Sequence, residues 1–192
     1  MDMENLIVFA SGTGTNTQAI IDHFRHSGEV KVALIVCNRP DAGVLHIAEK
    51  EGIPYLLVDR SSFNGPDFPA ALAAYRPSLI VLAGFLWKIS SEVVNAFPGK
   101  IINIHPALLP SFGGKGMYGA RVHEAVIGSR ARVSGITIHY VNEHYDEGDI
   151  ILQAHCPVRP GDTPDTLATR IHQLEHFYFP RAIEYLVLRN HQ

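Results

Sequence analysis

The chain has 192 residues, of which 46% are hydrophobic and 18% charged, and its formal net charge is −3 at pH 7. This length and composition fit one domain with its own core, expected to span residues 1–192. The mild acidity argues against a nucleic-acid or membrane partner, and no apolar run approaches the ~20 residues that cross a bilayer.

Short apolar runs alternate with helical stretches through the first half of the chain. Predicted strands cover residues 6–10, 31–37, 55–58, 79–83 and 100–103, and predicted helices cover residues 15–25, 44–51, 67–75 and 91–97. Strands separated by helices are typical of βαβ units. We therefore predict an α/β fold: a single-domain, Rossmann-like, mostly parallel twisted sheet with helices on both faces.

The pattern changes in the second half. Residues 111–116 are rich in glycine and predict a loop, which is followed by a short helix over residues 120–127. Apolar runs at 133–141 and 150–156, joined by a polar connection, predict an antiparallel hairpin appended to the sheet. The last element is a long helix with Thr163 as its N-cap, and Pro180 is expected to kink or divide it.

A glycine-containing loop, Ser-Gly-Thr-Gly-Thr-Asn at residues 11–16, lies between the first strand and the first helix. Glycines let the backbone approach a ligand, and a helix N-terminus attracts an anion. The third glycine and the acidic residue of a dinucleotide site are absent, as is the Gly-Lys-Ser/Thr of a Walker A loop. A mononucleotide phosphate fits this loop better, and the alternative is a tight turn capped by serine and threonine.

Asn103 and His105 follow an apolar run that is typical of a buried strand. On an extended segment their side chains point to the same face, because strand residues alternate sides. An amide that holds a developing oxyanion and an imidazole that moves a proton are the groups that acyl transfer requires. The alternative is a loop histidine with satisfied hydrogen bonds beside a turn-forming asparagine.

The hairpin connection holds three acids, Asp146, Glu147 and Asp149. A carboxylate near His105 would orient the ring and raise its pKa above the ordinary ~6.5. The sequence leaves open which of the three acids faces inward, and it is equally consistent with a solvated turn.

The cysteines and histidines give no indication of a disulfide or a metal site. Cys37 and Cys156 lie in apolar, strand-like runs and are expected to pack as reduced thiols. The 11 histidines include no HExxH pattern and no Cys/His cluster with ligand spacing. No leader peptide is recognisable at the N-terminus, so we expect a cytoplasmic protein without a metal cofactor.

The motifs together resemble the formyltransferase family that uses 10-formyltetrahydrofolate. They are Ser-Gly-x-Gly-x-Asn at 11–16, Ala-Gly-Phe at 83–85, Asn-Ile-His-Pro at 103–106 and Gln-Ala at 153–154, in an order that spans nearly the whole chain. Within the family, the resemblance is to the branch that formylates the amine of glycinamide ribonucleotide in purine biosynthesis. It implies two small-molecule substrates, with 10-formyltetrahydrofolate as co-substrate, and a monomer or homodimer.

The resemblance also implies roles for individual residues. The implied catalytic residues are Asn103 for the oxyanion, His105 for proton transfer and Asp146 to assist His105. The implied ribonucleotide contacts are Gly14, Thr15, Asn16, His172 and Glu175. The implied folate contacts are Leu86, Trp87, Lys88, Ile89, Asn142, Glu143, His144 and Tyr145. His139 is expected to pack behind these residues.

The chain departs from the family pattern at two places. The region 61–67 holds no arginine, although many members use one there for the folate tail, and residues 115–119 form a longer loop that could close over the site as a lid. The competing functions are a formyltetrahydrofolate deformylase, a methionyl-tRNA formyltransferase and a non-catalytic mononucleotide-binding module. The deformylase carries an N-terminal regulatory domain. The tRNA enzyme has a C-terminal RNA-binding domain and lacks the glycine loop, so we expect neither.

Overall fold

The structure, a computed structural model, describes residues 3–189. Its strands are β1 Glu4–Ala10, β2 Val30–Cys37, β3 Tyr55–Leu57, β4 Pro77–Leu82, β5 Ile101–His105, β6 Val133–Tyr140 and β7 Ile150–Pro157. Its helices are α1 Thr15–Phe24, α2 Gly43–Glu51, α3 Arg60–Phe63, α4 Phe68–Ala73, α5 Ser91–Ala96, α6 Ala120–Gly128 and α7 Pro164–Leu188.

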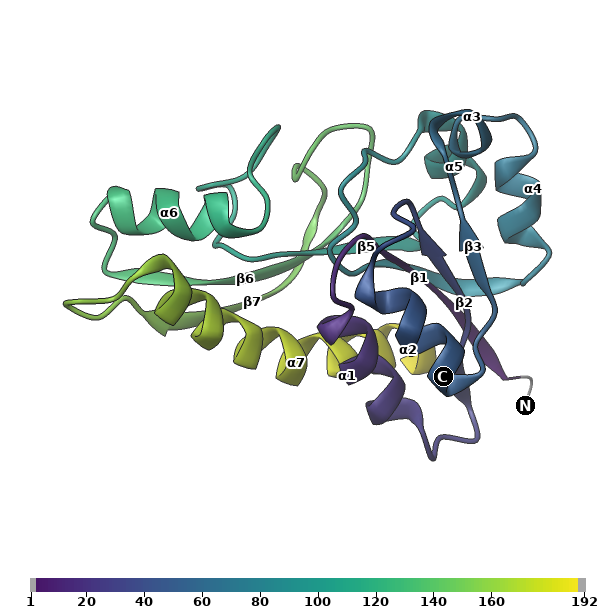
Figure 1. The fold of residues 1–192 in the computed structure, drawn as a ribbon, viewed down its shortest axis with the longest axis horizontal. Helices are drawn as coiled ribbons and strands as arrows, with labels where there is room; N and C mark the ends of the chain where they lie inside the picture. Colours follow the sequence, from purple (N-terminus) through teal and green to yellow (C-terminus); the bar gives the residue numbers. More distant parts are fainter. Residues whose placement is uncertain (1–2, 190–192) are drawn as a thin grey trace.

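The seven strands form one sheet in the order β3-β2-β1-β4-β5-β6-β7 (Figure 1). Strands β1 to β5 are parallel, while β6 pairs antiparallel with β5 and β7 antiparallel with β6. The predicted α/β fold with an appended hairpin is therefore confirmed. Helices must connect the parallel strands, because a parallel pair cannot be joined by a tight turn.

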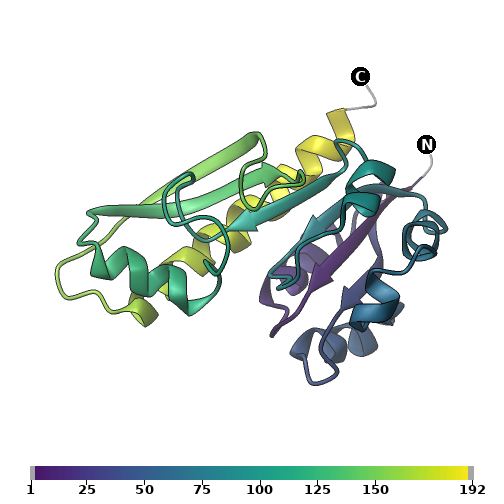
Figure 2. The same ribbon diagram turned by 90° about the horizontal axis from the view of Figure 1, so that it is seen from above.

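Side chains alternate across the sheet and so divide the core between its two faces. On β1, Leu6 and Val8 pack in the same cluster as residues of α1 and α7, whereas Ile7 and Phe9 pack with residues of α3, α4 and α5. Figure 2 shows these helices lying on opposite sides of the sheet. Burying both faces explains the nearly continuous apolar character of the parallel strands.

Helix α7 runs along β6 and β7 and past α1 (Figure 1). Thr163 caps its N-terminus by accepting a hydrogen bond from the Thr166 N–H, as predicted. The expected division at Pro180 is wrong, because the helix continues from Pro164 to Leu188. Pro180 and Phe179 are both buried, and this packing offsets the lost backbone hydrogen bond, a cost of about 3 kcal/mol.

The short helix α3 was not predicted. Its first turn is fixed by Asp59, whose carboxylate accepts a hydrogen bond from the Ser62 N–H, while Ser62 Oγ accepts one from the Asp59 N–H. Phe63 at its end is buried against α4 and the sheet. Arg60 is the first residue of this helix.

The strand order reverses between β1 and β4, since the chain leaves β1 toward β2 and β3 and then crosses back to β4. In open α/β sheets, ligands bind at the carboxyl ends of the strands where the order reverses. The loops that follow β1, β4 and β5 converge there. Within residues 3–189, no helix is both long enough and apolar enough to span a membrane.

Candidate active site

A cavity of about 560 Å³ opens at the carboxyl ends of β1, β4 and β5. This volume is in the range of sites for small-molecule ligands. The cavity brings together segments that are far apart in the sequence. The predicted site residues that line it are Gly14, Thr15, Asn16, Leu86, Trp87, Lys88, Ile89, Asn103, His105, Asn142, His144, Tyr145, Asp146, His172 and Glu175.

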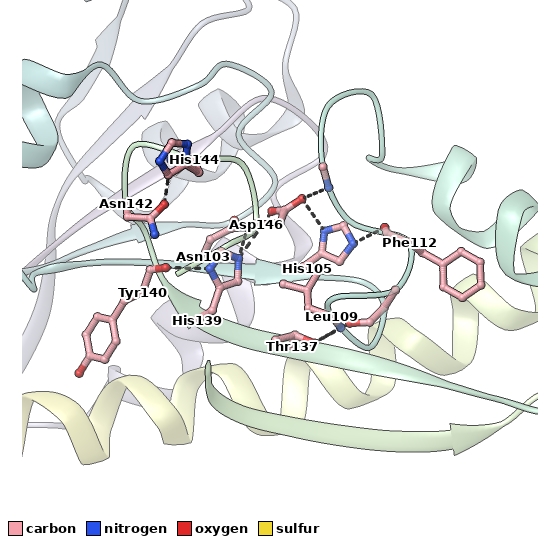
Figure 3. Close-up of polar contacts among 12 residues, drawn as sticks. Asn103, His105, Leu109, Phe112, Thr137, His139, Tyr140, Asn142, His144 and Asp146 are labelled. Carbon is pink, nitrogen blue, oxygen red and sulfur yellow. Dashed lines mark hydrogen bonds and ion pairs between the residues drawn. The ribbon is translucent and has the colours of Figure 1, made fainter. Parts of the chain in front are cut away.

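Asn103 is held by a histidine on the neighbouring strand. The register of β5 and β6 places Asn103 opposite His139, and the Asn103 Nδ2 lies 3.1 Å from the His139 Nε2 (Figure 3). The His139 Nδ1 lies 2.8 Å from the Tyr140 carbonyl oxygen, which can only accept a hydrogen bond. The His139 Nδ1 therefore carries a proton, and in the neutral ring its Nε2 accepts from Asn103. This contact agrees with the expected supporting role of His139.

His105 points into the same cavity as Asn103, as their alternation on the strand predicts. Its Nε2 donates to the Phe112 carbonyl oxygen at 2.7 Å, and its Nδ1 lies 3.6 Å from the Asp146 Oδ2 (Figure 3). Because the Nε2 carries the hydrogen, Nδ1 is the nitrogen that can take up a further proton. That proton would then lie next to a carboxylate.

The pKa of His105 differs from the expectation. His105 is only 3% exposed, and this burial lowers its pKa below the ordinary value, although Asp146 and the Phe112 carbonyl act to raise it. The prediction that Asp146 raises the pKa of His105 above ~6.5 is therefore wrong in its net direction. Burial outweighs the attraction of the carboxylate, so the imidazole is predominantly neutral at pH 7.

Asp146 is the acid of the hairpin connection that faces inward. Its Oδ2 accepts a hydrogen bond of 2.9 Å from the Gly114 N–H, and its Oδ1 lies 3.6 Å from the His139 Nε2. Burial raises the pKa of Asp146, but contacts with His139, His105 and Gly114 outweigh it and hold the pKa below its usual value. The turn needs Gly148, because a Cβ there would collide with the Tyr140 carbonyl oxygen.

The loop after β1 has the conformation that the phosphate prediction requires. Gly14 precedes α1 with φ of 82°, and a Cβ at this position would lie 2.9 Å from Val44 atoms. Only glycine therefore fits. Helix α1 begins at Thr15 without a side-chain cap, so its first N–H groups remain directed toward an anion.

The loop is joined to α7 through Glu175. The Glu175 Oε2 accepts hydrogen bonds of 2.9 Å from the Asn16 Nδ2 and from the His172 Nδ1. Glu175 is 4% exposed, and its hydrogen bond raises the pKa of His172. The structure thus places the predicted ribonucleotide residues from both ends of the chain in one cluster.

The predicted folate residues lie on the loops after β4 and β6. The Leu86 N–H donates to the Ser11 Oγ at 2.9 Å, which joins the β4 loop to the phosphate loop. Glu143 is the exception among the predicted contacts, because it is exposed and does not line the cavity. Its neighbours His144 and Tyr145 do line it.

The sequence predicted no role for Arg60 or His123. The Arg60 guanidinium carbon lies 4.0 Å from the centre of the Trp87 ring, and the buried His123 lines the cavity. The predicted folate contact Lys88 has its Nζ 5.6 Å from the centre of the Tyr145 ring, and the loop of residues 114–119 also lines the cavity. Among residues 3–189, no group of three or more His, Cys, Asp or Glu side chains is placed to hold a metal ion.

The Asp146→Asn variant is expected to lower the pKa of His105 further, because the Asp146 carboxylate acts to raise it. In the unmodified protein, the His105 ring is expected to titrate below 6.5. NMR shifts of the imidazole Cε1–H group, followed against pH, measure both values. Glu147→Gln removes the same charge from an exposed neighbour and should leave the titration unchanged. A rise in the pKa of His105 in the Asp146→Asn variant would contradict the conclusion that the Asp146 carboxylate raises this pKa.

Residues 4–183 match the Formyl transferase family. The chain is 44% identical over 188 residues to the chloroplastic phosphoribosylglycinamide formyltransferase of Arabidopsis thaliana, covering 94% of this chain and 64% of that protein. It is 38% identical over 196 residues to phosphoribosylglycinamide formyltransferase of Bacillus subtilis (strain 168), covering 99% of this chain and 98% of that protein.

Solved structures agree with these relatives. The crystal structure of phosphoribosylglycinamide formyltransferase from Anaplasma phagocytophilum matches with a TM-score of 0.90 at 32% identity, covering 98% of this chain and 88% of that one. The chain spans only 64% and 61% of its plant relatives and less than a fifth of the trifunctional proteins that it also matches. The match over residues 4–183 nevertheless includes the whole cavity, and the chain belongs to the formyl transferase family.

Proposed function

We propose that the protein transfers the formyl group of 10-formyltetrahydrofolate to the amine of glycinamide ribonucleotide in purine biosynthesis. The single observation that supports this most strongly is the arrangement of Asn103, His105 and Asp146 in one cavity with the uncapped N-terminus of α1. The Bacillus subtilis relative, which this chain matches over 98% of its length, has the name phosphoribosylglycinamide formyltransferase and supports the choice of acceptor.

The reaction forms a bond between the ribonucleotide amine nitrogen and the formyl carbon, and then breaks the bond from that carbon to the folate nitrogen. The formyl oxygen carries negative charge in the tetrahedral intermediate. Asn103 has a second Nδ2 hydrogen, not used by His139, and donates it to this oxygen. His139 fixes which end of the amide points to the substrate.

His105 moves the proton between the two nitrogens. It begins neutral, so it can take up at its Nδ1 the proton that the attacking amine loses. The Asp146 carboxylate lies 3.6 Å from this nitrogen and stabilises the charged ring. A water molecule between the carboxylate and the ring can relay the proton over this distance. The charged ring then gives the proton to the departing folate nitrogen. No covalent enzyme intermediate is required.

The two substrates approach from different parts of the cavity. The phosphate of the ribonucleotide binds at Gly14, Thr15 and Asn16, and its sugar lies toward His172 and Glu175. The folate ring lies between the segments Leu86–Ile89 and Asn142–Tyr145. Arg60 and Lys88 are exposed cations for which residues 3–189 provide no carboxylate partner, so they can attract the anionic tail of the folate.

The Arg60→Ala variant is expected to raise the KM for a polyglutamylated folate by about fivefold, a scale typical of one exposed charge pair. The KM for the ribonucleotide should not change, because Arg60 lies over Trp87 on the folate side. Steady-state kinetics with folates of different tail length measure the effect. Lys100→Ala, at the opposite end of β5, is the matched control. Equal effects on folates with and without a charged tail would refute this assignment.

The function is tested by following deformylation of 10-formyltetrahydrofolate with and without glycinamide ribonucleotide. We expect tetrahydrofolate to form only when the ribonucleotide is present, with one formyl group transferred for each folate released. Equal rates in both conditions would identify a deformylase instead. Binding of the ribonucleotide without any reaction would identify a non-catalytic mononucleotide-binding module.

A further inference from the structure

His123 is a buried histidine of α6 that lines the cavity. It is 4% exposed, and its Nδ1 atom has no hydrogen-bond partner within residues 3–189. A buried polar atom without a partner destabilises the folded state, so such atoms are rare in folded proteins. His123 also borders a smaller adjoining cavity of about 220 Å³, which it shares with His172. The ring therefore borders both cavities and has a nitrogen that no group of the described residues satisfies.

The groups around His123 indicate how it can bind. Burial lowers its pKa, and His172 lowers it further, while Glu175 acts in the opposite direction. A neutral imidazole has one donor and one acceptor nitrogen. A hydroxyl group also donates one hydrogen bond and accepts others, so it matches a neutral imidazole. An unprotonated phosphate can only accept hydrogen bonds and matches it less well.

The position beside Glu175 supports a hydroxyl over a phosphate. Glu175 is a buried residue of the same cavity, and its carboxylate would repel a phosphate but accept a hydrogen bond from a sugar hydroxyl. His123 shares the smaller cavity with His172, whose Nδ1 lies 2.9 Å from the Glu175 Oε2, so His123 lies on the Glu175 side of the site.

We propose that His123 is a specificity-determining residue that hydrogen-bonds a ribose hydroxyl of the ribonucleotide beside Glu175. This rests on the proposed function, because the ribonucleotide is the acceptor named there. No sequence motif predicts a role for His123. His123 contributes to ribonucleotide binding through a contact that forms only when the cavity holds a sugar.

Binding of ribose 5-phosphate, measured by calorimetry without folate, tests the inference independently of turnover. His123→Leu is expected to weaken ribose 5-phosphate by at least ~fivefold, the scale of one lost hydrogen bond, and to leave inorganic phosphate binding unchanged. Asn places an amide atom near the Nδ1 position and Gln near the Nε2 position. We expect either His123→Asn or His123→Gln to restore most of the affinity.

Kinetics give a second readout. With His123→Leu, the KM for glycinamide ribonucleotide should rise while the KM for 10-formyltetrahydrofolate stays within a factor of about two, since the lost contact is to one substrate only. Equal weakening of inorganic phosphate and ribose 5-phosphate would overturn the proposal. So would unchanged affinity in His123→Leu, or equal affinities of the Leu, Asn and Gln variants.

Two further outcomes keep the result interpretable. If His123→Leu does not fold, the test uses the unmodified protein. The NMR signals of its His123 imidazole should shift when ribose 5-phosphate is added. Unchanged signals would overturn the proposal. If the unmodified protein binds ribose 5-phosphate through His123 but transfers no formyl group, the proposed function fails while the assignment of His123 stands.

Discussion

Replacing His105 by alanine is expected to lower the turnover number of formyl transfer by at least ~10²-fold, the scale of a lost acid–base group. The reason is geometric: its Nδ1 is the ring nitrogen left available once the Nε2 donates to the Phe112 carbonyl oxygen. The Asp146 carboxylate lies 3.6 Å from this Nδ1 and stabilises the ring once it is charged. Single-turnover kinetics with both substrates saturating measure the change.

Two controls separate chemistry from folding in this experiment. His46→Ala changes a histidine whose side chain is 86% exposed and should leave turnover unchanged. His105→Ala removes a ring that is 3% exposed, so its thermal stability must be compared with that of the unmodified protein. A folded His105→Ala variant with unchanged turnover would remove His105 from the mechanism.

Replacing Asn103 by alanine is expected to lower turnover by about 10²- to 10³-fold, the range observed for loss of one oxyanion donor. The donor is the second Nδ2 hydrogen, whose direction is set by the contact with His139 at 3.1 Å. Because the oxyanion exists only after attack, the KM values should change little while the turnover number falls. Asn103→Asp, which puts a negative charge at the same place, should be at least as damaging.

The matched control for this experiment is Asn5→Ala. Asn5 is also a half-buried strand asparagine, and its Nδ2 donates to the Tyr75 carbonyl oxygen at 2.8 Å, away from the cavity. The Asn5→Ala variant is expected to be less stable than the unmodified protein, with unchanged turnover in the folded fraction. An increase in KM with no change in turnover for Asn103→Ala would show that Asn103 binds substrate and does not stabilise the transition state.

Much of the fold could be predicted because it follows from local patterns. The alternation of short apolar runs with helical stretches predicts the parallel sheet, and the polar connection after β6 predicts the hairpin. Gly14 and Thr163 act through the backbone conformations and caps that these residue types favour. The predicted division of the last helix at Pro180 is wrong, since Pro180 is buried within a helix that continues to Leu188.

Part of the candidate site could be predicted for the same reason. Asn103 and His105 share a face because strand residues alternate, whatever surrounds them. The residue pattern by itself left three acids open, and only the family resemblance pointed to Asp146, because the choice depends on how the turn packs against the Gly114 N–H. Arg60 and His123 were missed because their roles arise from neighbours such as Trp87 and Glu175, which are distant in the sequence.

The sequence by itself determined the order of elements, the glycine loop before α1 and the amide–imidazole pair at the end of β5. These depend on the residue types and their spacing along the chain. Only the tertiary structure decided the protonation of His105, the distance to its acidic partner and the unpaired state of the His123 Nδ1. Burial and electrostatic attraction act through space, so their balance is fixed only when distant segments close around the cavity.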